Sequence, residues 1–256
     1  MKLIIIQSFA TTKRILKELL RTKRNLIFWA IFPMLMLILF GLIYAGNNEQ
    51  GRSFDATAPG ILIGAALFFS CLGGTTALIV GERERLTLNR VLITPMKPIS
   101  YFLGIVMAHL VIGYFQTIVV YGTAFLFGGS IHGSLWLVMA IITMSIIAFV
   151  GLGFVFGATF AKRTEDVNGP VAAIGVPLLV LGGTFFPVSI LPDYLLLVAK
   201  ADPVFHMNQA LKFVSAKGAT ISDISTYFIF LVLFSIASLI AGVYFYQRLL
   251  HSIKKD

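Results

Sequence analysis

Few residues in this sequence have types and spacings that suit catalytic or metal chemistry. The four histidines, His109, His132, His206 and His251, are far apart along the chain, and the only cysteine is Cys71. A structural or catalytic metal site gathers several such side chains around one ion. A phosphate-binding P-loop needs the stretch G-x-x-x-x-G-K-[ST], which does not occur. We therefore expect no metal, no cofactor and no catalytic residue in the chain itself.

The most distinctive spacing is that of a short charged segment. Its residues are Glu82, Arg83, Glu84, Arg85, Leu86, Thr87, Leu88 and Arg90. They are good helix formers, and Pro95 and Pro98 would end a helix there, since proline lacks the amide donor. The segment predicts a short helix over 82–92 that a partner protein can bind. A solvated turn is the simpler alternative.

Outside this segment, long parts of the sequence have no charged residue. Only 12% of the 256 residues are charged, 58% are hydrophobic and the mean hydropathy is +0.92. A soluble domain normally carries about 25% charged residues. The stretches without a charged residue are 25–48, 56–81, 99–161, 167–191 and 224–247. This composition cannot cover a water-facing surface, so lipid must cover much of the protein.

The lengths of these stretches predict an all-α membrane protein. A spanning helix needs about 20 apolar residues, and the stretch 99–161 holds two with a turn near Gly128-Gly129. We expect one transmembrane domain over 1–256 with six spans, near 26–45, 59–80, 101–127, 135–160, 170–188 and 226–247. Inside them, His109, Gln116 and Tyr121 are the polar candidates, better suited to hydrogen bonds between helices than to an ion site. Energy for uphill transport must then come from a partner.

The basic residues predict the orientation. Sixteen of the 20 Lys and Arg residues fall in the N-terminal arm, the 81–100 loop, the 161–169 loop and the C-terminal tail. Cytoplasmic loops are rich in Lys and Arg, so both termini should be cytoplasmic in a multi-pass protein of the cell membrane. The net charge of +9 then reflects contact with anionic lipid rather than with nucleic acid.

Residues 1–24 predict an amphipathic helix on the cytoplasmic membrane surface. Its basic side carries Lys13, Arg14, Lys17 and Arg21, with Ile5, Phe9, Leu16, Leu19 and Leu20 roughly opposite. A basic face opposite an apolar face suits the lipid headgroup region. A disordered basic arm is the alternative.

The segment after 170–188 is irregular. Phe185, Phe186, Pro187, Leu191 and Pro192 separate two apolar pieces too short to span. Such pieces predict short re-entrant or interfacial helices that line an exit, because irregular backbone at membrane depth must be buried by protein or reached by water. A simple external loop is the competing interpretation.

Three motifs give a resemblance to the membrane subunit of type 2 ABC transporters. Arg21-Thr22-Lys23-Arg24 before Phe32-Pro33 is similar to the family's entry into its first span. Glu82 to Leu88 and Arg90 to Pro95 resemble its loop E-R-E-x-G-T-L…L-x-T-P, and 185–192 with Asp202 to His206 and Ala210-Leu211-Lys212 resembles its C-terminal signature. The chain departs from the family pattern at Leu86, usually Gly, and at Lys212, usually Arg.

The resemblance implies a non-catalytic permease of an ATP-driven exporter. Two permease chains, identical or related, would pair with two ATPase subunits, which bind the ATP and Mg. Residues 82–92 would form the coupling helix that contacts the ATPase, and the N-terminal helix would lie at the same interface. The outer pieces around 185–192 would shape the exit.

The cargo and the class of protein leave alternatives open. Spans without charge but with many of the 23 Phe residues favour an amphiphilic, lipid-like or drug-like cargo, whereas related exporters carry polysaccharides or other cargo. A membrane transferase would need polar groups at one depth, and His109 and His132 are expected in opposite halves of the membrane. A channel or scaffold without a partner is the third class.

Overall fold

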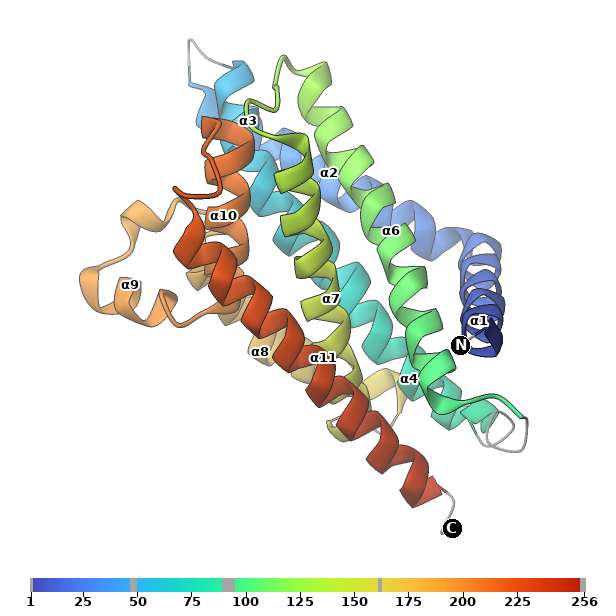
Figure 1. The fold of residues 1–256 in the computed structure, drawn as a ribbon. Coiled ribbons are helices and arrows are strands. Elements are labelled where there is room, and N and C mark those ends of the chain that lie inside the picture. The colour runs from blue at the N-terminus through green and yellow to red at the C-terminus, as the bar shows by residue number, and fades with distance from the viewer. Residues whose placement is uncertain (1, 47–49, 89–94, 161–162, 254–256) are drawn as a thin grey trace.

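The computed structural model describes residues 2–46, 50–88, 95–160 and 163–253, which form a helical bundle (Figure 1). No strand occurs in these ranges. The elements are α1 (Lys2–Arg21), α2 (Lys23–Ala45), α3 (Gln50–Gly60), the π-helical segment η1 (Ile61–Gly73), α4 (Gly74–Glu84), α6 (Pro98–Leu126), α7 (Leu135–Thr159), the 3₁₀ turn η2 (Thr164–Asp166), α8 (Asn168–Leu181), the 3₁₀ turn η3 (Val188–Ile190), α9 (Asp193–Ala199), α10 (Pro203–Lys217) and α11 (Ser225–Ile253).

Five helices of the described part are long and apolar enough to cross a membrane. They are α2, the continuous helix made of α3, η1 and α4, and the helices α6, α7 and α11. Each covers one of the predicted spans to within one residue, because about 20 residues without charge can satisfy their backbone groups within a membrane only as helix. Below, "the α4–α6 end" is the end of the bundle where α4 ends and α6 begins. "The α6–α7 end" is the opposite one.

The remaining predicted span, 170–188, forms a shorter helix than predicted. α8 ends at Leu181 after 14 residues, a length of about 21 Å, less than the ~30 Å of the hydrocarbon layer. Gly183 then adopts a φ of 72°, a conformation that glycine reaches without a steric penalty. The chain continues through η3 and the separate helices α9 and α10.

The helix α3–η1–α4 forms the centre of the bundle. Almost every residue of η1 is buried, and the helix contacts α2, α6, α7, α8 and α10. Phe68 illustrates the packing, with its ring at right angles to those of Phe69 and Phe149, at centroid distances of 5.3 and 5.8 Å. The most apolar part of the chain is thus enclosed by other helices.

Small residues bring α7 and α11 into close contact. A Cβ atom on Gly151 would lie 2.6 Å from the backbone carbonyl carbon of Ser238, and one on Gly242 would lie 2.9 Å from the carbonyl oxygen of Gly151. Ser235 adds a hydroxyl that donates to the carbonyl of Met144 at 2.9 Å. Glycine and serine at helix contacts permit close approach within membranes.

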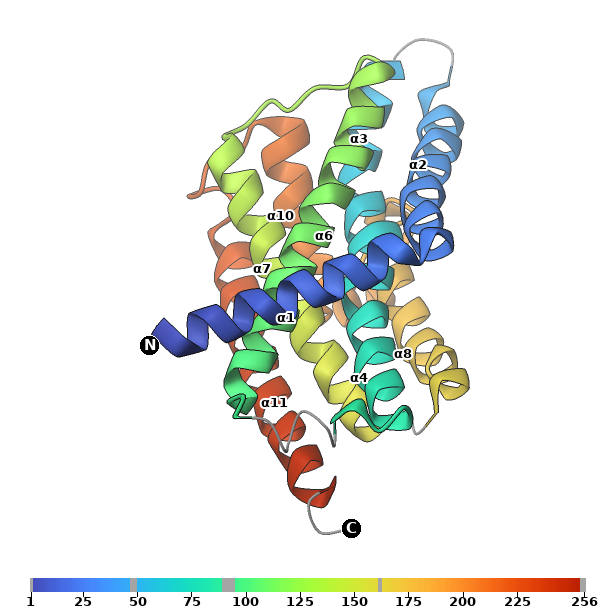
Figure 2. The same ribbon diagram turned by 90° about the vertical axis from the view of Figure 1, so that its right-hand side faces the viewer.

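The helix α1 lies across the bundle rather than along it (Figure 2). Its buried face is polar, with Ser8, Thr11, Thr12 and Ile15 packed toward α6. The Ser8 and Thr12 hydroxyls donate to the carbonyls of Ser100 and Gly104, each at 3.0 Å. The sequence predicted only a basic side and an apolar side for this helix, so this buried polar face was not predicted.

Several apolar residues of α1 point away from the bundle, although Ile15 is buried and Leu16 packs against the core. Ile5, Phe9 and Leu20 are each more than half exposed. The same holds for rows of residues on α2, such as Leu35, and on α11, such as Leu233. Large exposed apolar surfaces mark contact with lipid or with another protein.

Candidate functional site

The charged segment predicted as a separate helix over 82–92 begins as the last turn of α4. Glu82, Arg83 and Glu84 belong to that helix, and the chain turns at Arg85 and Leu86. Thr87 and Leu88 are again helical, with Leu88 buried, whereas Arg90 lies outside the described residues. The described part of the predicted helix is thus divided by a turn.

The turn depends on an unusual backbone conformation at Leu86. Its φ is 55°, and its amide donates to the carbonyl of Arg83 at 3.0 Å. This left-handed region is common for glycine but strained for a residue with a Cβ. It is also the position of the glycine in the motif E-R-E-x-G-T-L that this segment resembles.

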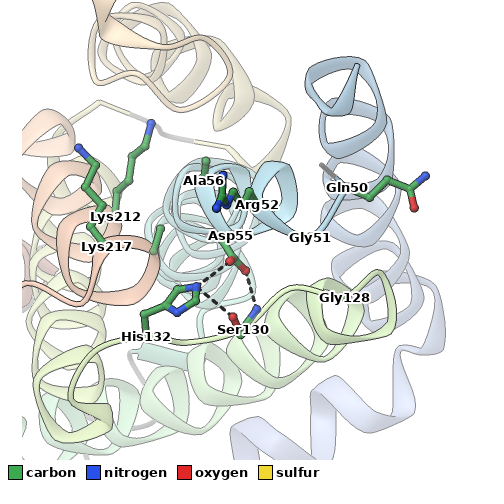
Figure 3. A pocket seen from close by; sticks show the side chains of 11 residues that line it. Gln50, Gly51, Arg52, Asp55, Ala56, Gly128, Ser130, His132, Lys212 and Lys217 are labelled. Carbon is green, nitrogen blue, oxygen red and sulfur yellow. Dashed lines mark hydrogen bonds and ion pairs between the residues drawn. The ribbon is translucent and has the colours of Figure 1, made fainter. Parts of the chain in front are cut away.

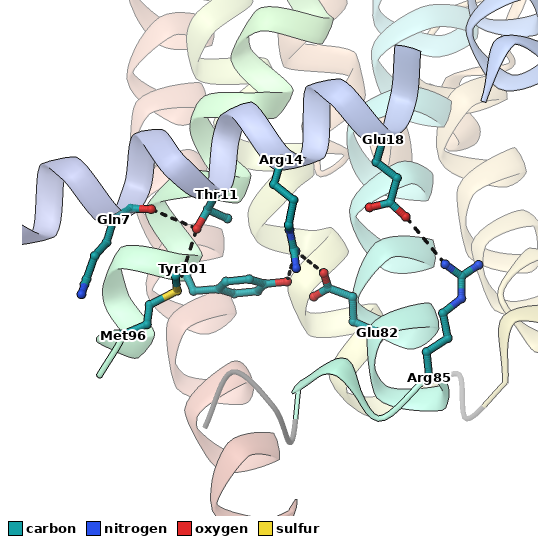
Figure 4. Close-up of polar contacts among 8 residues, drawn as sticks. All are labelled: Gln7, Thr11, Arg14, Glu18, Glu82, Arg85, Met96 and Tyr101. Atoms are coloured by element: carbon teal, nitrogen blue, oxygen red, sulfur yellow. Dashed lines mark hydrogen bonds and ion pairs between the residues drawn. The ribbon is translucent and has the colours of Figure 1, made fainter. Parts of the chain in front are cut away.

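Arg14 of α1 joins α4 and α6 at this end (Figure 4). Its guanidinium pairs with the carboxylate of Glu82 and donates to the Tyr101 hydroxyl at 2.9 Å. The guanidinium carbon lies 5.5 Å from the centroid of the Tyr101 ring. The Glu82 side chain is only 9% exposed, so this charge depends on its partner. We call Arg14, Glu82 and Tyr101 the junction.

Further polar contacts surround the junction. Glu18 of α1 pairs with Arg85 at 3.6 Å, and Glu84 accepts hydrogen bonds from the amide and hydroxyl of Thr164 in η2. Gln7 of α1 donates to the carbonyl of Pro95 at 3.2 Å. α1 therefore contacts both sides of the connection between α4 and α6, and η2 contacts the end of α4.

The structure brings together only some of the predicted residues of this region. Of the basic residues expected on α1, Arg14 enters the junction, and Lys13, Lys17 and Arg21 are exposed. Tyr101 was not predicted as part of this region. Gln7 and Glu18 were not predicted either, although helical periodicity would have indicated both, because they lie seven and four residues from Arg14 on the same helical face.

Of the three polar residues predicted inside the spans, His109 makes the expected contact between helices. His109 of α6 bonds Thr75 of α4 through Nε2 at 3.2 Å, and its Nδ1 bonds the carbonyl of Ile105 at 2.9 Å. Cys71 is fully buried beside Ser70. No group of three metal-ligating side chains occurs within the described ranges.

At the α6–α7 end, the segment after α8 is fixed by contacts to α2 and α10. Phe185 and Phe186 pack against Phe40 of α2, with centroid distances of 5.7 and 6.1 Å. The Tyr44 hydroxyl donates to the carbonyl of Phe185 at 2.8 Å. Asn208 of α10 donates to the carbonyl of Gly182 at 3.0 Å. The polypeptide here is ordered by specific side chains.

Two cavities that share Ala56 and Lys212 lie at this end of the bundle. The smaller, of about 210 Å³, is lined by Phe185, Phe186 and Pro187 together with Tyr44 and Lys212. Leu191 and Pro192, predicted for the same region, follow η3 and do not line it.

The larger cavity, of about 810 Å³, shares Lys212 and lies between α3, α10 and the loop between α6 and α7. Figure 3 shows its interior, with Asp55 facing His132 and Ser130. Asp55 pairs with Nε2 of His132 at 3.0 Å and accepts the Ser130 amide. These three residues were not predicted to form a site together.

A match to a protein-family model shows which family has these features. The model for the ABC-2 type transporter matches residues 6–216, most of the chain. The chain belongs to the ABC-2 type transporter family. The motif positions noted above fall within that match, and this family supplies the membrane domains of ABC transporters.

A relative of this ABC-2 domain is the ABC transporter G family member 20 of Dictyostelium discoideum. The two are 27% identical over 194 residues, which cover 74% of this chain and 26% of that protein. The ABC-2 domain therefore spans about a quarter of the relative's length. Together with the apolar helices, these similarities identify the chain as a multi-pass membrane subunit of an ABC transporter.

Proposed function

We propose that the chain is the non-catalytic permease of an ATP-driven exporter and that its α4–α6 end binds a separate ATPase subunit in the cytoplasm. The junction of Arg14, Glu82 and Tyr101 carries this proposal. It connects α1, α4 and α6 directly beside the segment whose sequence resembles the coupling helix of the family. A force on that segment acts on three helices together.

The orientation follows from the basic residues. The positive-inside rule places the α4–α6 end and both termini in the cytoplasm of a cell that carries the protein in its plasma or inner membrane. The exposed apolar side of α1 then faces lipid. In this arrangement α8 and the chain that continues from it to residue 188 together make the sixth crossing, which both termini on one side require. η3 and α9 then belong to the re-entrant region of the exit.

A membrane transferase is the alternative of another class, and the polar groups near His132 do not favour it. The Ser130 hydroxyl and the Asp55 carboxylate both contact Nε2 of His132, at 3.0 Å each. A catalytic triad needs the serine and the acid on opposite ring nitrogens, so that the histidine can relay a proton. The group is arranged to hold a loop in place.

Cysteine labelling tests the orientation. Cys71 is fully buried, so a cysteine introduced at exposed Leu86 or exposed Ala56 is the accessible thiol. In intact cells, a membrane-impermeant maleimide should label Ala56→Cys and should spare Leu86→Cys until the membrane is opened. The reverse pattern would place the α4–α6 end outside and end the proposal.

Co-purification tests the ATPase contact. Glu84 is exposed, and the side chain of Arg85 is 74% exposed, so a Glu84→Lys/Arg85→Glu variant changes the surface and breaks only exposed contacts, those to Thr164 and Glu18. It should reduce recovery of an ATPase encoded beside the permease by about tenfold or more. The matched control, Asp193→Lys at the opposite end, should leave recovery unchanged. Equal recovery from both variants would remove the assignment of the 82–88 surface.

The cargo proposed is an amphiphile, in keeping with the aromatic residues beside the exit segment. Polysaccharide or other cargo remains the alternative within the family. Stimulation of the complex's ATPase by candidate lipids and hydrophobic drugs in nanodiscs distinguishes them. No stimulation by any of these compounds would count against an amphiphile.

A further inference from the structure

The larger cavity at the α6–α7 end carries more positive charge than its own residues neutralise. Lys212 and Lys217 both belong to α10 and line it, and Figure 3 shows their side chains extending in the same direction. Lys212 is half-buried, and no carboxylate of the described residues pairs with it. Lys217 lies over the ring of Phe213, with Nζ 4.4 Å from the centroid.

The acid that lines the cavity is already engaged. The Asp55 side chain is only 7% exposed, and its two oxygens meet the Ser130 amide and the His132 ring. It therefore cannot also neutralise the two ammonium groups. The pKa of Lys212 is lowered by its burial and by the nearby charge of Lys217. An anion placed between the two lysines would relieve both effects.

The side chains around Lys212 include both polar and aromatic ones. Besides the larger cavity it lines the smaller one, whose wall includes Phe185, Phe186 and Tyr44. A free inorganic anion would use only the polar part. A molecule with an anionic head and an apolar body would use both parts at once.

We propose that these cavities bind an anionic amphiphile, with its phosphate or carboxylate group at Lys212 and Lys217 and its apolar part beside Phe185 and Phe186. Lysine is suited to phosphate as a compact point charge. Partial burial strengthens the attraction because water screens it less. The inference rests on the proposed function for the view that this amphiphile is cargo at the exit. The binding itself does not depend on that view.

The test measures binding without any ATPase. Ala56 is exposed and lines both cavities, so a bimane dye on Ala56→Cys in a Cys71→Ala background reports on the site. The purified chain in maltoside micelles is titrated with dioleoyl phosphatidylglycerol, with dioleoyl phosphatidylcholine, or with inorganic phosphate. We expect a saturable change with phosphatidylglycerol, and an affinity at least tenfold weaker for phosphatidylcholine and for phosphate.

Variants connect the signal to the lysines. Lys212→Gln should weaken phosphatidylglycerol binding about tenfold, whereas Lys212→Arg, which keeps the charge, should bind within about threefold of the parent. Lys200→Gln is the matched control, because Lys200 is exposed between α9 and α10 and lines neither cavity. Lys212→Arg also keeps the test decisive if the glutamine variant folds poorly.

The outcomes separate the possibilities. Equal affinity for both lipids, or unchanged binding by Lys212→Gln, would overturn the proposal. Tight binding of inorganic phosphate alone would show that the occupant is a free anion and would overturn the amphiphile. Since no nucleotide or partner takes part, failure here leaves the ATPase contact standing. Failure of that contact would not alter the lipid titration.

Discussion

At the scale of single residues, Leu86 shows how one backbone angle shapes the segment expected to meet the ATPase. Its φ of 55° lets the chain turn directly after α4 and begin a second helical piece at Thr87. The side chain itself is 61% exposed and adds little packing. Leu86 therefore adopts a backbone conformation typical of glycine, although its Cβ makes that conformation strained.

We predict that Leu86→Gly stabilises the protein. Removing the Cβ relieves the strain of a left-handed conformation, about 1 kcal/mol, and little buried area is lost. The apparent melting temperature in detergent should rise by a few degrees, as measured by intrinsic fluorescence. Leu86→Ala keeps a Cβ and should show no such gain, and a similar rise in both variants would contradict the explanation.

Asp202 is a second informative residue, between α9 and α10. One carboxylate oxygen caps α10 by accepting the Val204 amide at 2.8 Å, and the other is buried without a described partner. Burial raises the pKa of Asp202 to about 7, although its bond to Val204 acts the other way. The folded protein therefore holds a proton that the unfolded chain releases near its ordinary pKa of about 4.

The sign of the resulting pH dependence follows from this difference. Stability from Asp202 is fully present below about pH 4 and decreases as the pH rises through 7, because only the folded state binds the proton there. We expect Asp202→Asn, which keeps a capping side chain, to flatten that part of the melting-temperature curve between pH 4 and 8. A variant curve parallel to the parent's would rule out this role.

At the scale of elements, the close contact of α7 with α11 leaves little room for a larger side chain at Gly151. A Cβ on Gly151 would lie 2.6 Å from backbone atoms of Ser238, which cannot move as a side chain can. Gly151→Val should separate the two helices and cost several kcal/mol, seen as lower expression and a lower melting temperature. Gly122→Ala in α6 is the control, because nothing lies within 4 Å of its Cβ position. An unchanged Gly151→Val would mean that the helices pack more loosely.

The sequence predicted the long helices because charge-free stretches of sufficient length have few other structures in a membrane. It predicted less where local residues decide the outcome. Gly182-Gly183 ended α8 before 188, and the positive φ at Leu86 divided the segment over 82–92. Both outcomes depend on backbone angles, which the length of an apolar stretch does not predict.

The buried face of α1 was hidden for a different reason. Ser8, Thr11 and Thr12 are neutral in hydropathy, so the sequence divided the helix only into apolar and basic sides. In the structure they form the contact, through hydroxyls that bond carbonyls of α1 and α6. The cavity around Lys212 was equally hidden, because its residues come from three distant parts of the chain.

At the scale of the whole molecule, the outer faces of α2 and α11 are apolar and largely uncovered, because only 17% and 22% of the residues in their most apolar stretches are buried. Lipid covers some of this area, and the proposed function assigns another part to a second permease chain. We expect native mass spectrometry of the assembly to find two permease chains, either two copies of this 28.0 kDa chain or one copy with a related chain. An active assembly with a single permease chain would contradict the pairing.

The helix from Gln50 to Glu84 runs without a break from the cavity at one end to the charged turn at the other. Its 35 residues form a rod about 50 Å long at 1.5 Å per residue. A tilt of roughly 5° about its midpoint would displace each tip by about 2 Å in opposite directions. The cavity and the charged turn are therefore connected through one continuous element, and a tilt of that element would move both of them together with the helices packed around it.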